Sequence, residues 1–331
     1  MKAPFQMNKT YDVVFFDTIG MPYTGKTPGE KGLGGSEFQV ILLAEELASS
    51  GANVLVLNTT NESKRFADVD YAPYQRVGEI DFCHYFILNR YSRIPVISSQ
   101  KRFVWASDFA GPEYAHLESF FDGGSSATLV CLSEWQRQLF PSHWKSTVIP
   151  YMLPKWVYEL ELTANPKKFV YASAALKGLT QTLDVWREIV GTDNPQGLEL
   201  VVCSPGYDAP EMSQLMQTPG VKYIGSIPFD QVAKEIASSA GLFYVNVYPE
   251  TFCIVAALTE ALKRRTHILC VNSKGGLPET IRSPLLTFDR NHFMRVFQRY
   301  LEPNDENGLG EPKDYRPNTI SSQWIKLLDE K

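Results

Sequence analysis

The chain has 331 residues, of which 44% are hydrophobic and 21% charged, a composition typical of a globular protein and not of a disordered one. Its length corresponds to about two ordinary domains. The chain has 32 basic and 37 acidic residues, a net charge of −5, and its largest basic run is residues 263–265. We therefore expect no nucleic-acid partner, since such proteins bind phosphates through basic surfaces.

The first 150 residues alternate strand-like and helix-like segments. The apolar run 13–16 predicts a buried strand, and 36–47 predicts a helix with Ser36 as its N-cap and apolar residues at helical spacing. Further strands are expected at 54–57, 82–88, 102–105, 128–132 and 148–150, and helices at 112–121 and 133–140. This alternation predicts a parallel sheet covered by helices on both faces.

Residues 150–167 carry three prolines and break the alternation, so we place the first domain at 1–150. The alternation resumes in a second domain, 151–303. Its expected strands are 169–171, 198–203, 221–224, 242–245 and 268–271, and its expected helices are 179–190, 209–217, 228–239 and 253–264. The fold class is therefore α/β, with two Rossmann-like, doubly wound parallel-sheet domains facing a cleft.

The last segment, 304–331, is a polar stretch followed by a short amphipathic piece. Trp324, Leu327 and Leu328 are spaced i, i+3 and i+4, which predicts one apolar stripe on a helix at 321–328. So short a helix needs partners for its order, and we expect it to return to the first domain.

Membrane spans and disulfides are not indicated. The longest apolar runs, such as 40–43 and 242–247, are far too short to cross a bilayer, and residues 1–10 have no apolar signal core. The five cysteines are odd in number and widely spaced, which fits neither a disulfide framework nor a zinc site. We therefore expect a cytoplasmic protein.

One segment matches a nucleotide-binding pattern that we reject. Residues 20–27 satisfy G-x-x-x-x-G-K-[ST], but such a loop needs a helix that begins at Lys26 to hold phosphates. The proline and glycines of 28–35 predict that no helix starts before Ser36. The acidic pair of Asp68 and Asp70, which resembles a metal-binding D-x-D, is interpreted as an ordinary polar loop.

A second glycine-rich segment is more informative. Consecutive glycines before a helix let backbone amides approach an anion. The segment 34–37, Gly-Gly-Ser-Glu, resembles the first glycine loop of family 4 retaining glycosyltransferases, which have the two-domain GT-B fold. Four further segments resemble that family in the required order, and the resemblance spans about residues 13–290. They are 130–136, 169–179, 248–261 and 275–279.

The resemblance implies transfer of a sugar, with retention, from a nucleoside diphosphate donor to a hydroxyl of a glycan or another acceptor. It implies no metal or other cofactor, and it allows peripheral membrane association through the acceptor. The implied catalytic residues are Asp108 and Glu250. The implied donor-binding residues are Gly34, Gly35, Ser173, Lys177, Gly178, Glu250, Thr251, Phe252, Cys253 and Glu260.

The chemistry gives three of these residues distinct roles. A departing diphosphate needs a fixed cation and helix amides, and Lys177 can supply the cation; the alternative is a solvated loop lysine. Glu260 can accept two hydrogen bonds from the ribose hydroxyls, although on an exposed face it would simply pair with Lys263 or Arg264. Glu250 is the family's candidate for the sugar hydroxyls.

Four departures from the family pattern keep a second interpretation open. Ala172, Ser107 and Arg265 stand where the family has Arg, His and Gly, and nine residues rather than seven separate Glu250 from Glu260. The alternative is a GT-B protein that binds a nucleotide sugar or glycan and catalyses little. A phosphotransferase that uses Lys26 is the third hypothesis.

Overall fold

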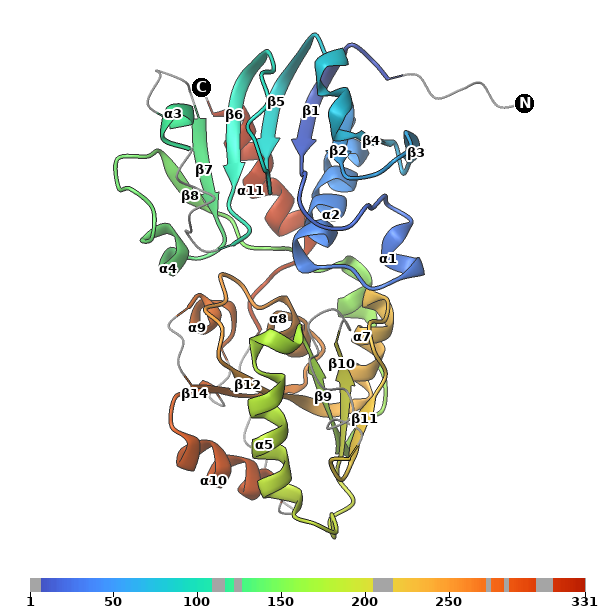
Figure 1. Ribbon diagram of the computed structural model, residues 1–331, viewed down its shortest axis with the longest axis vertical. Coiled ribbons are helices and arrows are strands. Elements are labelled where there is room, and N and C mark those ends of the chain that lie inside the picture. Colours follow the sequence, from blue (N-terminus) through green and yellow to red (C-terminus); the bar gives the residue numbers. More distant parts are fainter. Residues whose placement is uncertain are drawn as a thin grey trace, which may run out of the picture. The chain divides into compact units, whose positions relative to one another are not determined.

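The computed structural model divides the chain into two compact units. Unit 1 comprises Met1–Met152 together with Tyr315–Lys331, and unit 2 comprises Leu153–Asp314. Each unit is built on one sheet with helices against it (Figure 1). The structure describes residues 7–108, 117–121, 127–204, 217–271, 275–282, 286–301 and 312–330.

The sheet of unit 1 has the strand order β3-β4-β2-β1-β5-β6-β7-β8, and every pair is parallel except β3 with β4. Strand β1 lies between β2 and β5, so the winding of the chain reverses there and creates a switch point between β1 and β5. The strands are β1 (Thr10–Phe16), β2 (Val54–Asn58), β3 (Lys64–Phe66), β4 (Val69–Pro73), β5 (Phe82–Leu88), β6 (Ser99–Trp105), β7 (Ala127–Cys131) and β8 (Ser146–Val148).

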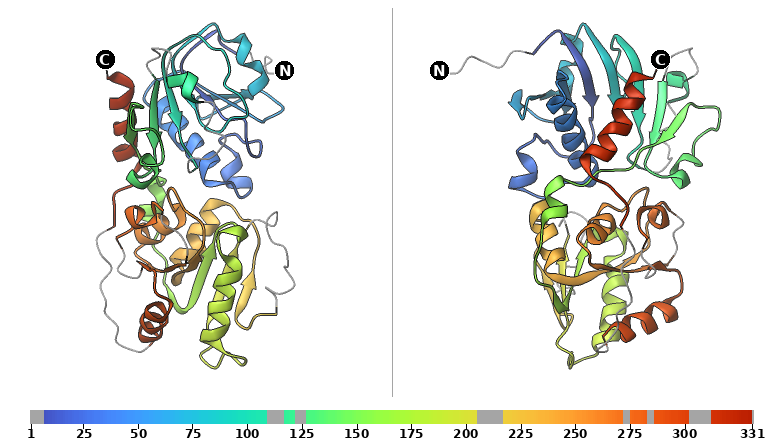
Figure 2. Two further views of the ribbon diagram at one scale, coloured as in Figure 1. Left: turned by 60° about the vertical axis from the view of Figure 1, so that its left-hand side comes forward. Right: turned by 180° about the vertical axis from the view of Figure 1, so that it is seen from behind.

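One face of this sheet is covered by α2 (Gly35–Ser49) and α11 (Pro317–Asp329), which lie side by side (Figure 2). Trp324 of α11 is fully buried, and its ring packs edge-on against Trp105 with centroids 5.0 Å apart. The C-terminal helix is therefore an integral part of unit 1.

The opposite face of the unit 1 sheet has a thinner cover. The apolar side chains of Val14, Phe16 and Phe86 pack there beneath η1 (Tyr74–Glu79) and α3 (Glu118–Phe121). The link from β5 to β6, residues 89–98, also crosses this face, and it contains no helix.

The sheet of unit 2 has the order β11-β10-β9-β12-β13-β14 and is parallel throughout. Its winding reverses between β9 and β12, which makes a second switch point. The strands are β9 (Asn165–Ala172), β10 (Glu199–Cys203), β11 (Val221–Tyr223), β12 (Ser239–Asn246), β13 (Arg265–Cys270) and β14 (Leu286–Thr287).

An aromatic core fastens two helices to one face of the unit 2 sheet. Trp186 of α5 (Leu179–Val190) packs against Phe169 and Phe243, and so does Phe297 of α10 (Arg290–Tyr300). The other elements among the described residues of the unit are η3 (Lys155–Glu159), η4 (Ala175–Lys177), α7 (Phe229–Ala237), α8 (Ile254–Ala261) and α9 (Leu277–Thr280).

The glycine- and proline-rich segment before α2 differs from the prediction in two ways. A one-turn helix, α1 (Thr27–Glu30), follows Lys26, so the prediction that no helix starts before Ser36 is wrong. Proline at the start of a helix costs no hydrogen bond, which explains why Pro28 does not prevent it. Helix α2 begins at Gly35 with Gly34 as its N-cap, in place of the expected Ser36.

The interpretation of Asp68 and Asp70 as a polar loop holds for Asp68, which lies in the exposed turn between β3 and β4, and is wrong for Asp70. Asp70 is buried within β4, where it accepts a hydrogen bond from the Tyr11 hydroxyl (3.0 Å) and lies 3.8 Å from the Arg65 guanidinium. These two partners offset part of the cost of burying the carboxylate, although Oδ1 makes no hydrogen bond and burial raises the pKa of Asp70.

Some helix ends also differ. Helix α4 (Glu134–Arg137) is shorter than the expected 133–140, and α8 ends at Ala261 rather than 264, because Lys263 adopts a left-handed conformation with φ 55°. The predicted helix at 209–217, apart from its last residue, and the first part of the one at 112–121 lie outside the described residues.

We expect Trp324→Ala to destabilise unit 1 by about 3–5 kcal/mol, because it removes a fully buried indole and leaves a cavity beside Trp105. Ile325→Ala, on the exposed side of the same helix, is the matched control. Hydrogen exchange resolved by unit measures the effect, and unchanged protection across residues 13–150 in the Trp324 variant would contradict it.

Glu45 of α2 makes the stability of unit 1 pH-dependent. Burial, reinforced by the neighbouring Glu46 carboxylate, raises the pKa of Glu45 to about 7 from its usual 4.5. Between these two values the folded chain holds a proton that the unfolded chain has released, so the free energy of unfolding falls as pH rises through that window.

We therefore expect Glu45→Gln to raise the melting temperature at pH 8 and to leave it nearly unchanged at pH 4, since Gln cannot ionise. Glu30→Gln, which removes an exposed carboxylate from the same unit, serves as control. The measurement is thermal unfolding across pH 4–8, and a stabilisation that is equal at all pH values would disprove the assignment.

Candidate functional site

The switch point of unit 2 brings two loops together at the carboxyl ends of β9 and β12. This edge is where open parallel sheets ordinarily bind ligands. The loop after β9 holds Ser173, Lys177 and Gly178, and the loop after β12 holds Glu250. The Val247 N–H donates to the Lys177 carbonyl oxygen (3.1 Å), which fastens one loop to the other.

The centre of the site is an ion pair between two residues that the sequence singled out. Lys177 Nζ lies 2.7 Å from Glu250 Oε2, and the Lys177 side chain is 29% exposed while that of Glu250 is 6% exposed. The Lys177 ammonium also lies 5.2 Å from the centre of the Tyr248 ring. A cation is therefore held in place and still open to solvent on one side.

Gly178 fixes the turn that presents Lys177. Its φ of 127° favours glycine, and a Cβ there would lie 1.9 Å from the Val245 carbonyl oxygen. Thr182 locks the same contact, because its hydroxyl donates to the Gly178 carbonyl (2.8 Å) and accepts from the Val245 N–H (3.0 Å). Helix α5 begins directly after Gly178, so its positive end lies beside Lys177.

The buried carboxylate of Glu250 is also held by residues that sequence reasoning missed. The Tyr244 hydroxyl donates to Glu250 Oε1 (3.1 Å) and accepts from the Asn246 side-chain amide (2.8 Å). Burial, and then the Glu250 carboxylate, raise the pKa of Tyr244 well above its ordinary value. Tyr244, Asn246 and Tyr248 alternate at the end of an apolar strand, a period-two signal that could have identified them.

The backbone of Glu250 is fixed by the glycine pair of residues 275–276. The Gly276 N–H donates to the Glu250 carbonyl oxygen (2.7 Å), and a Cβ at Gly275 would lie 2.8 Å from that oxygen. The glycine turn that the sequence placed after the paired-glutamate motif therefore supports Glu250 directly.

The three residues after Glu250 are buried: Thr251, Phe252 and Cys253. The Cys253 N–H donates to Thr280 Oγ1 (3.3 Å), so this amide is used within the unit. Burial raises the pKa of the Cys253 thiol to about 12, which keeps it protonated near neutrality.

Glu260 is held at a different segment. Its two carboxylate oxygens accept the Arg282 N–H at 2.9 and 3.1 Å, just after α9. The Arg264 guanidinium turns instead to the carbonyl oxygens of Ala237 and Leu162, both at 2.6 Å. The Glu260 carboxylate thus holds the segment that follows α9. Its role in binding ribose stays a prediction.

The switch point of unit 1 holds a second charged cluster. Arg90, after β5, donates to Asp17, after β1, through Nε (3.1 Å) and Nη2 (2.8 Å), and to Glu37 Oε1 through Nη1 (3.0 Å). Tyr23 also donates to Asp17 (2.8 Å). Burial raises the pKa of Asp17, although the Arg90 charge opposes this shift.

This cluster explains why glycine is needed at position 34, one of the predicted donor-binding residues. A Cβ at Gly34 would lie 2.4 Å from Glu37 Oε2, and the bond to Arg90 holds Glu37 in place. Gly35 is the first residue of α2. The glycine loop therefore packs against a carboxylate of its own unit.

The other predicted catalytic residue, Asp108, is exposed after β6 in unit 1. Its carbonyl oxygen accepts from the Gln136 side chain (2.6 Å). Ser107, where the resembling family has His, is buried and bonded to the side chain of Asn89. The structure thus brings together Ser173, Lys177, Gly178 and Glu250 in unit 2 and places Gly34, Gly35 and Asp108 in unit 1.

Among the described residues, no group of three or more His, Cys, Asp or Glu side chains is placed to hold a metal ion. In the same part of the chain, no helix has the length and hydropathy that crossing a membrane requires.

No protein-family model and no curated protein matches the sequence, whereas solved structures match it over nearly its full length. WaaG, a glycosyltransferase involved in lipopolysaccharide biosynthesis, has a TM-score of 0.63 at 13% identity and covers 96% of this chain and 100% of its own. HepE from Anabaena, solved with UDP and glucose, has a TM-score of 0.62 at 14% identity, with 97% and 99% covered.

OtsA, a trehalose-6-phosphate synthase, has a TM-score of 0.65 at 11% identity, with 96% of this chain and 99% of its own covered. At such low identities the likeness shows the fold. The chain has the architecture of the GT-B glycosyltransferase structures, with two parallel-sheet α/β domains.

Proposed function

We propose that the protein is a retaining glycosyltransferase that moves a sugar from a nucleoside diphosphate to an acceptor hydroxyl without a metal. The observation that carries this proposal is the partly exposed Lys177 ammonium beside the first turn of α5, paired with the buried Glu250. The GT-B fold supports it, and HepE, which shares that fold, was solved with UDP and with UDP-glucose.

The diphosphate is the part of the donor that this site suits best. A cation and the amides of a helix N-terminus can hold its charge, and the charge grows as the sugar leaves. Lys177 has three N–H donors, so it can bond to a phosphate oxygen while it still contacts Glu250. Glu250, whose charge is balanced by Lys177 and whose other oxygen accepts from Tyr244, keeps lone pairs that can accept hydrogen bonds from the sugar hydroxyls.

In the proposed reaction the bond between the anomeric carbon and the phosphate oxygen breaks, and its electron pair stays on the diphosphate. The acceptor oxygen bonds to the same face of the sugar, and its proton passes to the leaving phosphate. Asp108 is proposed to orient the acceptor hydroxyl, and Glu260 to bind the ribose. The acceptor is a glycan or another hydroxyl compound, reached in the cytoplasm or at a membrane surface.

Two observations favour a second candidate, a nucleotide-sugar or glycan-binding protein that transfers little. Both oxygens of Glu260 are engaged by the Arg282 N–H, and the Cys253 amide is engaged by Thr280. The Cys253 amide would have to leave Thr280 to bind the donor, and the Glu260 oxygens would have to accept the ribose hydroxyls beside the Arg282 N–H. Release of the nucleoside diphosphate from the donor distinguishes the two candidates.

We expect Lys177→Ala to weaken binding of a nucleoside diphosphate about ten- to a hundredfold and binding of the matching nucleoside hardly at all, because a charge-assisted bond to phosphate is lost. Lys177→Gln, which keeps a donor for Glu250, should show the same selectivity. Lys234→Ala removes an exposed lysine from the same unit and is the control. Calorimetry with UDP and uridine, and with the ADP and GDP pairs, measures this, and equal losses for diphosphate and nucleoside would refute the role.

Donor turnover should persist in excess EDTA, because we propose that Lys177 and helix amides replace a metal. The assay follows nucleoside diphosphate release from a panel of sugar donors, with and without chelator. Loss of release in EDTA and its recovery with Mn²⁺ or Mg²⁺ would overturn the metal-independent mechanism.

A further inference from the structure

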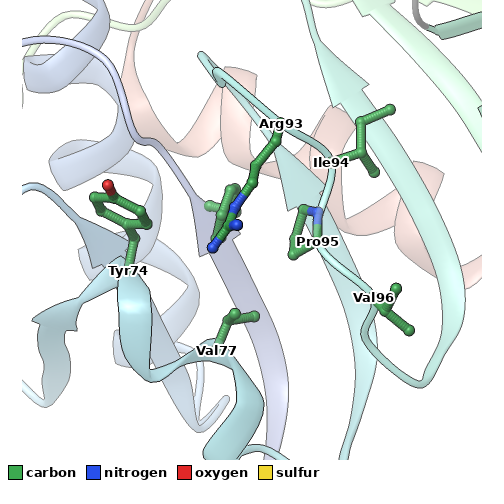
Figure 3. A pocket seen from close by; sticks show the side chains of 7 residues that line it. Tyr74, Val77, Arg93, Ile94, Pro95 and Val96 are labelled. Atoms are coloured by element: carbon green, nitrogen blue, oxygen red, sulfur yellow. The ribbon is translucent and has the colours of Figure 1, made fainter.

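A small cavity lies in unit 1, on the sheet face opposite α2 and α11. Its volume is about 240 Å³, and its lining comes from the end of β1, from η1 and from the helix-free link between β5 and β6. Figure 3 shows this pocket from close by. The lining residues are Phe16, Tyr74, Val77, Arg93, Ile94, Pro95 and Val96.

The pocket exists because the link leaves the sheet abruptly. Three hydrogen bonds pin residues 89–92 to the end of β1: the Asn89 N–H to the Phe16 carbonyl (3.0 Å), the Thr18 N–H to the Arg90 carbonyl (2.7 Å) and the Ser92 N–H to Thr18 Oγ1 (3.1 Å). After that point residues 93–98 run without helix or strand to β6. A loop this short cannot cover the face as a helix would.

Most of the wall is apolar. The Phe16 and Tyr74 rings, which meet edge-on with centroids 6.2 Å apart, form part of it, and Val77 and Pro95 add aliphatic surface. Such a wall offers few partners to a sugar ring, which needs many hydrogen bonds, and it suits an apolar ring. Since drug-sized ligands occupy about 300–1,000 Å³, this volume fits a single ring.

One charge distinguishes the pocket. Arg93 is exposed, and its guanidinium makes no hydrogen bond or ion pair with any residue that the structure describes. Figure 3 shows the side chain pointing from the link into the space between Tyr74 and Pro95. The guanidinium therefore offers five N–H donors at an apolar pocket where no described residue accepts them, which is the arrangement that recognises a phosphate or carboxylate.

We propose that this pocket binds a single apolar ring that carries a phosphate or a carboxylate. The ring lies against Phe16, and the anionic group bonds to Arg93. Binding of such a ring does not depend on the proposed function, and it can be measured without any donor.

Ligand-observed NMR on the full-length protein tests this with phenyl phosphate, benzoate, phenol and inorganic phosphate. We expect phenyl phosphate or benzoate to bind more tightly than both phenol and inorganic phosphate, and the tighter of the two identifies the anionic group. Arg93→Gln should lower the affinity for the ring anions about tenfold and leave phenol unchanged.

Two further variants make the test specific. Val77→Phe should fill the pocket and weaken phenol and the ring anions alike. Arg295→Gln removes an exposed arginine of α10 in unit 2 and should change nothing. Thermal unfolding of each variant checks that it folds, and Lys177→Ala, which tests the donor site, should leave phenyl phosphate binding unchanged.

Three results would overturn the proposal. If inorganic phosphate binds as tightly as phenyl phosphate, Arg93 binds anions without any contribution from the ring. If Arg93→Gln leaves binding of the ring anions unchanged, Arg93 does not bind the anionic group. Val96 is 99% exposed, so we include vesicles of phosphatidylglycerol. Sedimentation with these vesicles that depends on Arg93, without phenyl phosphate binding, would make the surface a lipid contact instead.

Discussion

The carboxylate of Glu250 is buried at the end of a parallel sheet, and the rest of the candidate site follows from what keeps it there. A buried charge is tolerated only when it is paired and hydrogen-bonded, and here Lys177 and Tyr244 each take one oxygen. Pairing ties the loop after β12 to the loop after β9. Gly178 is then required, because the two loops approach so closely that a side chain would collide with Val245.

Buried charges are also paired at the switch point of unit 1, but there one cation is shared by two carboxylates. Arg90 lies between two carboxylates, Asp17 and Glu37, whose charges outnumber its own, and its bonds to them occupy three of its five N–H donors. Lys177 faces one carboxylate and keeps part of its surface open. A diphosphate therefore suits unit 2 better than the glycine loop of unit 1, where Gly34 packs on Glu37.

Local patterns were enough to predict the α/β class, the strands β1, β2 and β5 and the helix α5. Each of these strands is a largely apolar run that ends at or before an Asp or Asn, and α5 is an apolar period with glycine at both ends. The pattern did not reveal β4, since its Asp70 looks like a loop residue until Tyr11 and Arg65 are seen to pair with it. Helix α8 ends early because the backbone of Lys263 is left-handed, and the spacing of apolar residues gives no sign of this.

Residues of the candidate site could be predicted where they belong to one short sequence motif. Contacts between residues from different loops could not be predicted. Lys177 and Glu250 were identified separately, yet nothing in their spacing shows that they form an ion pair 73 residues apart in the chain. The support from Tyr244 and the engagement of Glu260 by Arg282 arise from tertiary contacts between segments.

The most direct test of this account is the electron density of the protein crystallised with a nucleoside diphosphate. We expect the terminal phosphate within hydrogen-bonding distance of the Lys177 ammonium and of the first amides of α5, with Glu250 still bonded to Tyr244. A phosphate found at the Gly20–Thr27 turn, or anywhere away from the switch point of unit 2, would contradict the claim that this ion pair marks the donor site.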